Sequence, residues 1–259
     1  MKRFDGKVVL VTGAASGFGR RAAQRFAEEG ARLVLSDVKA EPLEEVAGAL
    51  RAETAVLAGD IAEEEVSARL VALAIERFGR LDVALNNAGI AQNFMKLPLT
   101  PSDEARRIID VDVMGVFYAM KHQLPVMERQ FRVSGAGGRI VNVASVAGIA
   151  GAPRLAVYSA AKHAVVGLTR SAAAEYARKG IAVNAVCPSF ARTPMLESAL
   201  AGASAADAVS AEAEIVRGVP MRRLAEVDEI VEVILFASDF RNSFMTGQTL
   251  AADGGITAI

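Results

Sequence analysis

The stretch that decides the fold is Lys7-Val8-Val9-Leu10-Val11-Thr12-Gly13-Ala14-Ala15-Ser16-Gly17-Phe18-Gly19. A short aliphatic run leads directly into a glycine-rich turn, and helical periodicity begins at Gly17. Three glycines in a strand-to-helix turn let the backbone approach a pyrophosphate, which then lies at the helix N-terminus. Because the trio follows a strand and opens a helix, it predicts a dinucleotide site rather than an ordinary tight turn. The expected contacts are Gly13, Ser16, Gly17, Phe18 and Gly19.

Similar apolar runs alternate with helical stretches along the whole chain. The expected strands are Lys7–Thr12, Arg32–Ser36, Thr54–Ala58, Leu81–Asn86, Arg139–Ala144 and Ile181–Cys187. The expected helices are Gly17–Glu29, Glu41–Arg51, Glu63–Phe78, Pro101–Arg129 and Arg154–Lys179. Nearly continuous Val, Ile, Leu and Ala is typical of parallel strands covered on both faces. The alternation predicts a doubly wound, mostly parallel α/β sheet, with residues 1–259 as a single domain.

Two segments that leave strand ends have no regular pattern. Ala88–Thr100 follows the fourth strand, and Pro188–Pro220 follows the sixth, with weak helical character at Met195–Ala201 and Ala208–Arg217. Open α/β sheets bind ligands outside the carboxyl ends of their strands. We therefore expect these segments to form a substrate wall and a lid at about residues 188–220.

Composition narrows the classes of function. The 259 residues carry a net charge of -1, with 29 basic against 30 acidic residues, so no strong field favours nucleic acid or an anionic membrane. One cysteine excludes an internal disulfide and fits a reducing compartment, and with two histidines it excludes a structural zinc cluster. No apolar run reaches the roughly 18 residues of a membrane helix. These features predict a cytoplasmic protein and no metal site, although composition leaves open a metal bound only by carboxylates.

Acidic and amide side chains end three further strands. Asp37 lies 18 residues beyond Gly19, close to the interval at which a carboxylate binds the ribose hydroxyls of NAD. A carboxylate there would also repel the 2′-phosphate of NADP, so the sequence favours NAD, with Lys39 as the one contrary feature nearby. Asp60 and Asn86-Asn87-Ala88-Gly89 end the third and fourth strands on the same rim, although such residues are also common turn formers.

Tyr158 and Lys162 are four residues apart in a helical stretch and so share one helix face. Ser145 ends the preceding strand, 13 residues before Tyr158. A phenol is a poor base at neutral pH, but an adjacent ammonium lowers its pKa and makes it a usable general acid/base. A hydroxyl at Ser145 would hold the substrate oxygen. With the glycine turn upstream, these three residues predict a catalytic site.

Together these motifs resemble the short-chain dehydrogenase/reductase family. They run in order from Thr12-Gly-x-x-x-Gly17-x-Gly19 through Asn86-Asn87-Ala88-Gly89, Ser145 and Tyr158-x-x-x-Lys162 to Asp253-Gly254-Gly255. The resemblance implies a seven-stranded Rossmann-type sheet, bound NAD(P), hydride exchange with a secondary alcohol or ketone, and a homotetramer whose C-terminal segment lies in an interface.

The resemblance also assigns residues. Tyr158 would be the acid/base, Lys162 its partner and a binder of the nicotinamide ribose, and Ser145 the anchor for the substrate oxygen. Further cofactor contacts would come from Asp60, Ile61, Asn87, Ala88, Gly89, Val186, Pro188 and Thr193.

Two residues depart from the family pattern. Asp112 stands where the family often has an Asn whose backbone carbonyl holds a water linked to the catalytic lysine. An ionised carboxylate near Lys162 would raise the lysine pKa and offset its effect on Tyr158, unless the position tolerates either side chain. Ser189 follows Pro188 where Gly is common, so we expect an ordinary backbone conformation there.

The expected substrate pocket is apolar and favours a hydrophobic or cyclic secondary alcohol. Its residues would be Phe94, Ala147, Phe190, Met195 and Leu196. Reduction of a 3-oxoacyl thioester is the alternative reaction, although the net charge of -2 over Phe190–Val219 does not invite a phosphate-rich acyl carrier. A non-catalytic NAD(H)-binding regulator is a third reading, which would have no need of a basic tyrosine with its lysine.

Overall fold

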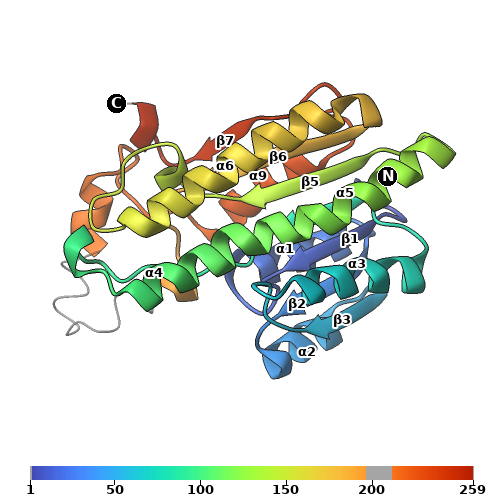
Figure 1. The fold of residues 1–259 in the computed structure, drawn as a ribbon, viewed down its shortest axis with the longest axis horizontal. Helices are drawn as coiled ribbons and strands as arrows, with labels where there is room; N and C mark the ends of the chain where they lie inside the picture. The colour runs from blue at the N-terminus through green and yellow to red at the C-terminus, as the bar shows by residue number, and fades with distance from the viewer. Residues whose placement is uncertain (1, 197–211, 259) are drawn as a thin grey trace.

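A computed structural model describes residues 2–196 and 212–258 and shows one sheet of seven parallel strands (Figure 1). The strand order is β3-β2-β1-β4-β5-β6-β7, which confirms the predicted doubly wound sheet. The strands are β1 (Val8–Thr12), β2 (Arg32–Asp37), β3 (Thr54–Ala58), β4 (Val83–Asn86), β5 (Gly138–Val143), β6 (Ile181–Pro188) and β7 (Thr249–Ala252). The order reverses between β1 and β4, and such a switch point opens a crevice at the carboxyl edge of the sheet.

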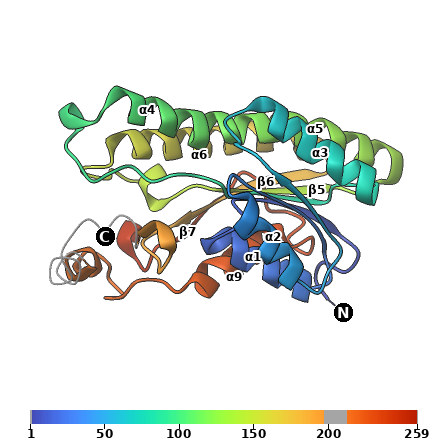
Figure 2. The same ribbon diagram turned by 90° about the horizontal axis from the view of Figure 1, so that it is seen from below.

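Helices cover both faces of the sheet, as Figure 2 shows in side view. One face carries α3 (Glu64–Phe78), α4 (Ser102–Ile109), α5 (Gly115–Ser134) and α6 (Ala156–Tyr176). The other carries α1 (Gly17–Glu28), α2 (Ala40–Ala49) and α9 (Val227–Ser238). In the part of the chain that the structure describes, no helix is both long and apolar enough to span a membrane.

The core consists of two apolar layers separated by the sheet. Successive residues of β1 point alternately into the two layers. Val9 and Val11 pack under α1 and α9, whereas Val8 and Leu10 pack under α3 and α5. Every residue of β1 is buried, as expected for a central parallel strand. This rigid sheet fixes the positions of the loops at its carboxyl edge.

The expected single helix over Pro101–Arg129 is wrong in detail. The structure divides it into α4 and α5, joined by a π-helical turn at Asp110–Met114, and extends it to Ser134. A π-turn inserts an extra residue into the helical repeat and so rotates the side chains that follow. Here it turns Asp112 into the interior, where the carboxylate is fully buried.

The last part of the chain contains a helix that the sequence reading missed. The segment α9 has apolar residues at helical spacing and begins with a capping box. The Glu226 side chain accepts a hydrogen bond from the backbone N–H of Glu229, and the Glu229 side chain accepts one from the backbone N–H of Glu226. Of the two expected lid helices, Met195–Ala201 and Ala208–Arg217, residues 197–211 lie outside the described residues. Residues 194–196 and 212–217 are helical.

Candidate active site

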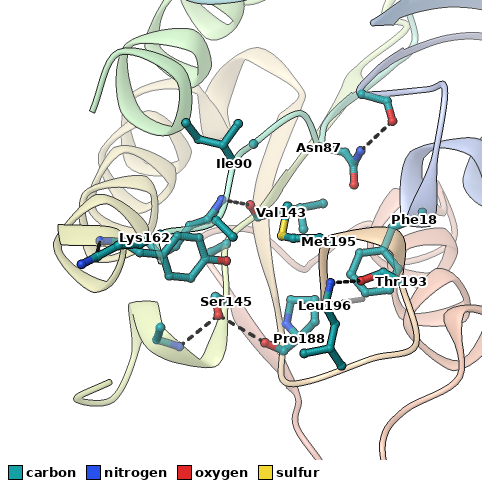
Figure 3. Close-up of a pocket in the computed structure, with 18 of the residues that line it drawn as sticks. Phe18, Asn87, Ile90, Val143, Ser145, Lys162, Pro188, Thr193, Met195 and Leu196 are labelled. Carbon is teal, nitrogen blue, oxygen red and sulfur yellow. Dashed lines mark hydrogen bonds between the residues drawn. The ribbon is translucent and has the colours of Figure 1, made fainter. Parts of the chain in front are cut away.

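A cavity of about 590 Å³ opens at the carboxyl edge of the sheet. It is lined by all of the predicted site residues except Gly19, Asp112 and Val186, the last of which is buried in the core. In Figure 3, Ser145 and Lys162 lie on one side of the cavity, and Phe18, Asn87 and Thr193 lie on the other. The sequence motifs therefore meet in one place.

The glycine turn is shaped for close approach. Gly13 and Gly17 adopt φ values of 66° and 51°, a left-handed region that favours glycine. A Cβ at Gly19 would lie 2.1 Å from the Gly13 carbonyl oxygen, so this glycine lets the helix pack against the turn. Helix α1 has no side-chain cap and no acidic residue in its first turn. Its free N–H groups and positive dipole end thus fit the pyrophosphate of a dinucleotide.

Asn87 holds the glycine turn against the end of β4. Its Nδ2 donates to the carbonyl oxygens of Thr12 and Gly13 at 2.9 and 3.3 Å. In return, the backbone N–H groups of Asn87 and Ala88 both donate to Thr12 Oγ1 at 3.1 Å. Asn87, which the sequence predicts to contact the cofactor, therefore also sets the shape of the glycine turn.

Asp37 lies at the end of β2 and faces the cavity. Its Oδ2 accepts a hydrogen bond from Ala15 N and its Oδ1 one from Lys39 N, both at 3.0 Å. Each oxygen retains a lone pair, so the carboxylate is fixed yet still able to accept bonds from a ribose.

Asp60 and Ile61 form the neighbouring part of the rim. Asp60 caps its own turn at Ala62 N and forms an ion pair of 2.6 Å with Arg107, a cavity-lining cation that the sequence reading did not identify. Arg107 lies on α4, far from Asp60 in the sequence, so no spacing of residues along the chain could predict this ion pair.

Ser145, Tyr158 and Lys162 converge as predicted. Ser145 follows β5, where its hydroxyl accepts from Ala147 N at 3.1 Å and lies 3.5 Å from the Pro188 carbonyl oxygen. Tyr158 and Lys162 project from α6, and the Lys162 ammonium lies 5.4 Å from the centre of the Tyr158 ring. Lys162 Nζ also donates to the Val143 carbonyl at 3.3 Å.

The electrostatics of Tyr158 differ from the sequence expectation in their balance. Burial raises the pKa of Tyr158, whereas the Lys162 ammonium and the Ser145 hydroxyl lower it, and the net direction is upward. Lys162 therefore acts on the phenol in the predicted sense, but desolvation is larger. Burial lowers the pKa of Lys162, but Asp112 and Tyr158 together raise it by more, so the net direction is upward. The lysine therefore remains an ammonium at neutral pH.

Asp112 lies directly behind Lys162. Its Oδ2 is 3.1 Å from Lys162 Nζ in an ion pair, and its Oδ1 accepts from Ile90 N at 2.8 Å. Both charges are buried, with Lys162 only 4% exposed. Asp112 also raises the pKa of Tyr158, so the carboxylate acts on the phenol directly as well as through the lysine.

Besides these polar groups, the cavity wall has many apolar residues. It contains the expected Phe94, Ala147, Phe190, Met195 and Leu196, and also Val146, Ala150, Leu155 and Ile256, which were not predicted. Gln92, also not predicted, lines the same region although it is buried. Ser189 does not adopt a positive φ, as expected.

A switch-point crevice with a glycine turn, a carboxylate at the end of β2 and a Ser-Tyr-Lys set defines a nicotinamide-dependent oxidoreductase that acts on CH–OH groups. Residues 13–257 match a family model described as enoyl-(acyl carrier protein) reductase. The chain belongs to the short-chain dehydrogenase/reductase family.

Relatives named for a reaction match almost the whole chain. It is 42% identical to cis-4-hydroxycyclohexanecarboxylate dehydrogenase of Sinomonas cyclohexanicum, covering 99% of this chain and 98% of the relative. It is 37% identical to cyclohexanol dehydrogenase of Acinetobacter sp. (strain SE19), covering 99% and 97%. The crystal structure of levodione reductase matches with a TM-score of 0.93 at 36% identity, covering 99% of both chains.

Proposed function

We propose that this protein is an NAD-preferring dehydrogenase that interconverts uncharged cyclic secondary alcohols and their ketones. The observation that carries the proposal is the mostly apolar wall of the cavity that also holds Ser145, Tyr158 and Lys162. Relatives named for cyclohexanol and for a hydroxycyclohexanecarboxylate support the cyclic substrate.

The three polar side chains divide the proton chemistry. Ser145 would hold the substrate oxygen by a hydrogen bond, and the Tyr158 phenolate would accept the hydroxyl proton in the oxidation direction. The Lys162 ammonium, which lowers the pKa of Tyr158, stabilises that phenolate. The nicotinamide, when bound, supplies the hydride acceptor. In the reduction direction Tyr158 would return the proton to the ketone oxygen.

Cofactor binding would follow from the rim of the cavity. The glycine turn (Gly13, Ser16, Gly17, Phe18 and Gly19) would hold the pyrophosphate. Asp60, Ile61, Asn87, Ala88 and Gly89 would contact the adenosine half, and Lys162, Pro188 and Thr193 the nicotinamide half. Asp37 would accept bonds from the ribose hydroxyls and repel a 2′-phosphate, which supports NAD over NADP.

The distribution of charge supports an uncharged substrate. Among the described cavity residues, the cations are Lys39 and Arg107 near the adenosine rim and Lys162, which is paired with Asp112. The sequence of residues 197–211 contains Glu197 and Asp207 but no Lys or Arg. A substrate carboxylate would therefore be desolvated without a cationic partner, which is costly.

Reduction of a 3-oxoacyl thioester is the second candidate, because the description of the matching family model names an acyl-carrier-protein thioester as substrate, although the reaction named there reduces an enoyl C=C bond rather than a ketone. The segment that follows β6 disfavours a phosphate-rich carrier, since its Arg192 is already paired with Glu212 and Glu226. We further propose a homotetramer in the cytoplasm, as the family resemblance and the single cysteine imply.

The test is a matched substrate set with NAD: cyclohexanol, cis-4-hydroxycyclohexanecarboxylate and the methyl ester of that acid. The ester should exceed the carboxylate in kcat/KM by at least about tenfold, which corresponds to roughly 1.4 kcal/mol of unpaired charge. A carboxylate preferred over its ester would refute the uncharged substrate class. Turnover of acetoacetyl thioesters with no turnover of cyclic alcohols would favour the second candidate.

A further inference from the structure

The helix that carries the acid/base begins without a cap of its own. Helix α6 starts at Ala156, and its N-cap residue Leu155 has no side-chain group that bonds to the helix. The first N–H groups of any helix lack intrahelical acceptors and must find partners elsewhere. Tyr158 is the third residue of this helix, so its own N–H belongs to that first turn.

Gln92 supplies the missing cap from a distant part of the sequence. Its Oε1 accepts hydrogen bonds from both Val157 N and Tyr158 N, each at 3.1 Å. Its Nε2 donates to Thr100 Oγ1 at 3.2 Å, which fixes the orientation of the amide. The side chain is 2% exposed, so water does not compete well for these bonds.

The same loop is tied to the helix and to the π-turn at other points. Ile90 N donates to Asp112 Oδ1 at 2.8 Å, and Met95 N donates to the Arg154 carbonyl at 3.0 Å. The Arg154 guanidinium in turn donates to the Phe94 carbonyl at 3.1 Å. The substrate wall around Phe94 and the first turn of α6 therefore form one connected unit.

We propose that Gln92 is a positioning residue that fixes Tyr158 relative to the substrate wall. This rests on the proposed function, in which Tyr158 exchanges a proton with the substrate oxygen. The amide acts through the backbone of α6 and takes no part in proton or hydride transfer. Loss of its two bonds would free the turn that carries the phenol, and a displacement of about 1 Å at a reacting group can cost roughly 100-fold in rate.

The chemistry of the cap separates the useful variants. Gln92→Ala removes the acceptor, whereas Gln92→Glu keeps a carboxyl oxygen for Val157 N and Tyr158 N. A negative charge is also favourable at a helix N-terminus. Asn93→Ala is the matched control, because Asn93 is an exposed amide next in the sequence.

The experiment measures kcat and KM for cyclohexanol together with the Kd for NADH. We expect Gln92→Ala to lower kcat about 100-fold with little change in the Kd for NADH, and Gln92→Glu to restore most of the loss. Asn93→Ala should match the wild type. A Gln92→Ala protein with unchanged kcat and a raised KM would overturn the proposal, because Gln92 would then be a substrate contact. An equally inactive Gln92→Glu protein would also overturn it.

Amide hydrogen exchange provides a readout that does not depend on turnover. Gln92→Ala should accelerate exchange at Val157 and Tyr158 selectively, while the amides of α9 keep their protection. If the wild type turned over no cyclic alcohol, the proposed function would fail. Selective exchange at these two amides would still show that Gln92 fixes the first turn of α6. Unchanged exchange at both amides would overturn the positioning role.

Discussion

Replacement of Asp112 by Asn removes one charge from a buried pair while preserving the shape of the side chain. The amide oxygen can still accept from Ile90 N, which now donates to Asp112 Oδ1 at 2.8 Å. Lys162, however, loses the carboxylate that lies 3.1 Å from its Nζ. The variant therefore isolates the electrostatic role of the carboxylate from its structural role.

The separation sets the size of the effect. Two unit charges 3.1 Å apart attract by about 5 kcal/mol at an effective dielectric constant near 20, and much of this offsets the cost of burying them. Removal of one partner of a buried pair costs about 3–5 kcal/mol. At roughly 2–4 °C per kcal/mol for a domain of this size, we expect Tm to fall by about 6–20 °C at pH 7.

The pH dependence has a definite sign. Because the carboxylate raises the folded pKa of Lys162, the pair stabilises the fold below the unfolded lysine pKa and loses that contribution as pH rises through the folded value. Stabilisation by the pair is thus fully present at pH 7. Asp112 also raises the pKa of Tyr158, so Asp112→Asn should move the acidic limb of the pH–rate profile for alcohol oxidation to lower pH. On that limb, each pH unit of displacement corresponds to a roughly tenfold higher kcat/KM at a given pH.

The assay records kcat/KM for alcohol oxidation against pH, together with Tm, for Asp112→Asn and for Asp110→Asn. Asp110 is an exposed residue of the same π-turn, so its variant changes the net charge equally without touching Lys162. Coincident pH profiles and an unchanged Tm for wild type and Asp112→Asn would refute the reasoning. An equal displacement in both variants would assign the effect to net charge.

Two further predictions concern the cofactor. Asp37→Asn keeps an acceptor for Ala15 N or Lys39 N but loses the negative charge. Repulsion between a carboxylate and a nearby phosphate is worth roughly 1–3 kcal/mol, so the ratio of kcat/KM for NADP to that for NAD should rise about 10- to 100-fold. An unchanged ratio would contradict the assigned role of Asp37. Gly19→Ala places a Cβ 2.1 Å from the Gly13 carbonyl oxygen and should weaken NADH binding at least about tenfold, which fluorescence titration would detect; wild-type affinity would rule out the cofactor turn as described.

Local patterns along the chain were sufficient to predict most of the fold. The continuous apolar runs indicated six of the strands, because parallel strands buried on both faces leave no polar alternation to misread. The π-turn at Asp110–Met114 was not predictable, since its sequence continues the helical pattern on both sides. The residue after it, Gly115, packs so closely against Ile61 that a Cβ would lie 2.6 Å from Ile61 Cδ1. Helix α9 did carry a readable signal in its apolar spacing and its capping box.

The candidate site was predictable where one motif carries the chemistry. Tyr158 and Lys162 share a helix face, and the glycine turn lies between a strand and a helix, so both are local patterns. Gln92 and Arg107 were missed because their partners are remote: Gln92 bonds to residues 65 and 66 positions away, and Arg107 pairs across 47 positions. Only the fold brings such groups together.

The measurement that tests the central claim most directly is NADH formation from NAD and cyclohexanol by the wild type and by Tyr158→Phe. The variant keeps the ring beside Lys162 but has no hydroxyl to exchange a proton. We predict turnover by the wild type, a loss of at least about 100-fold in the variant, and unchanged NADH binding in both. Equal turnover by the two proteins would contradict the assignment of Tyr158 as the acid/base.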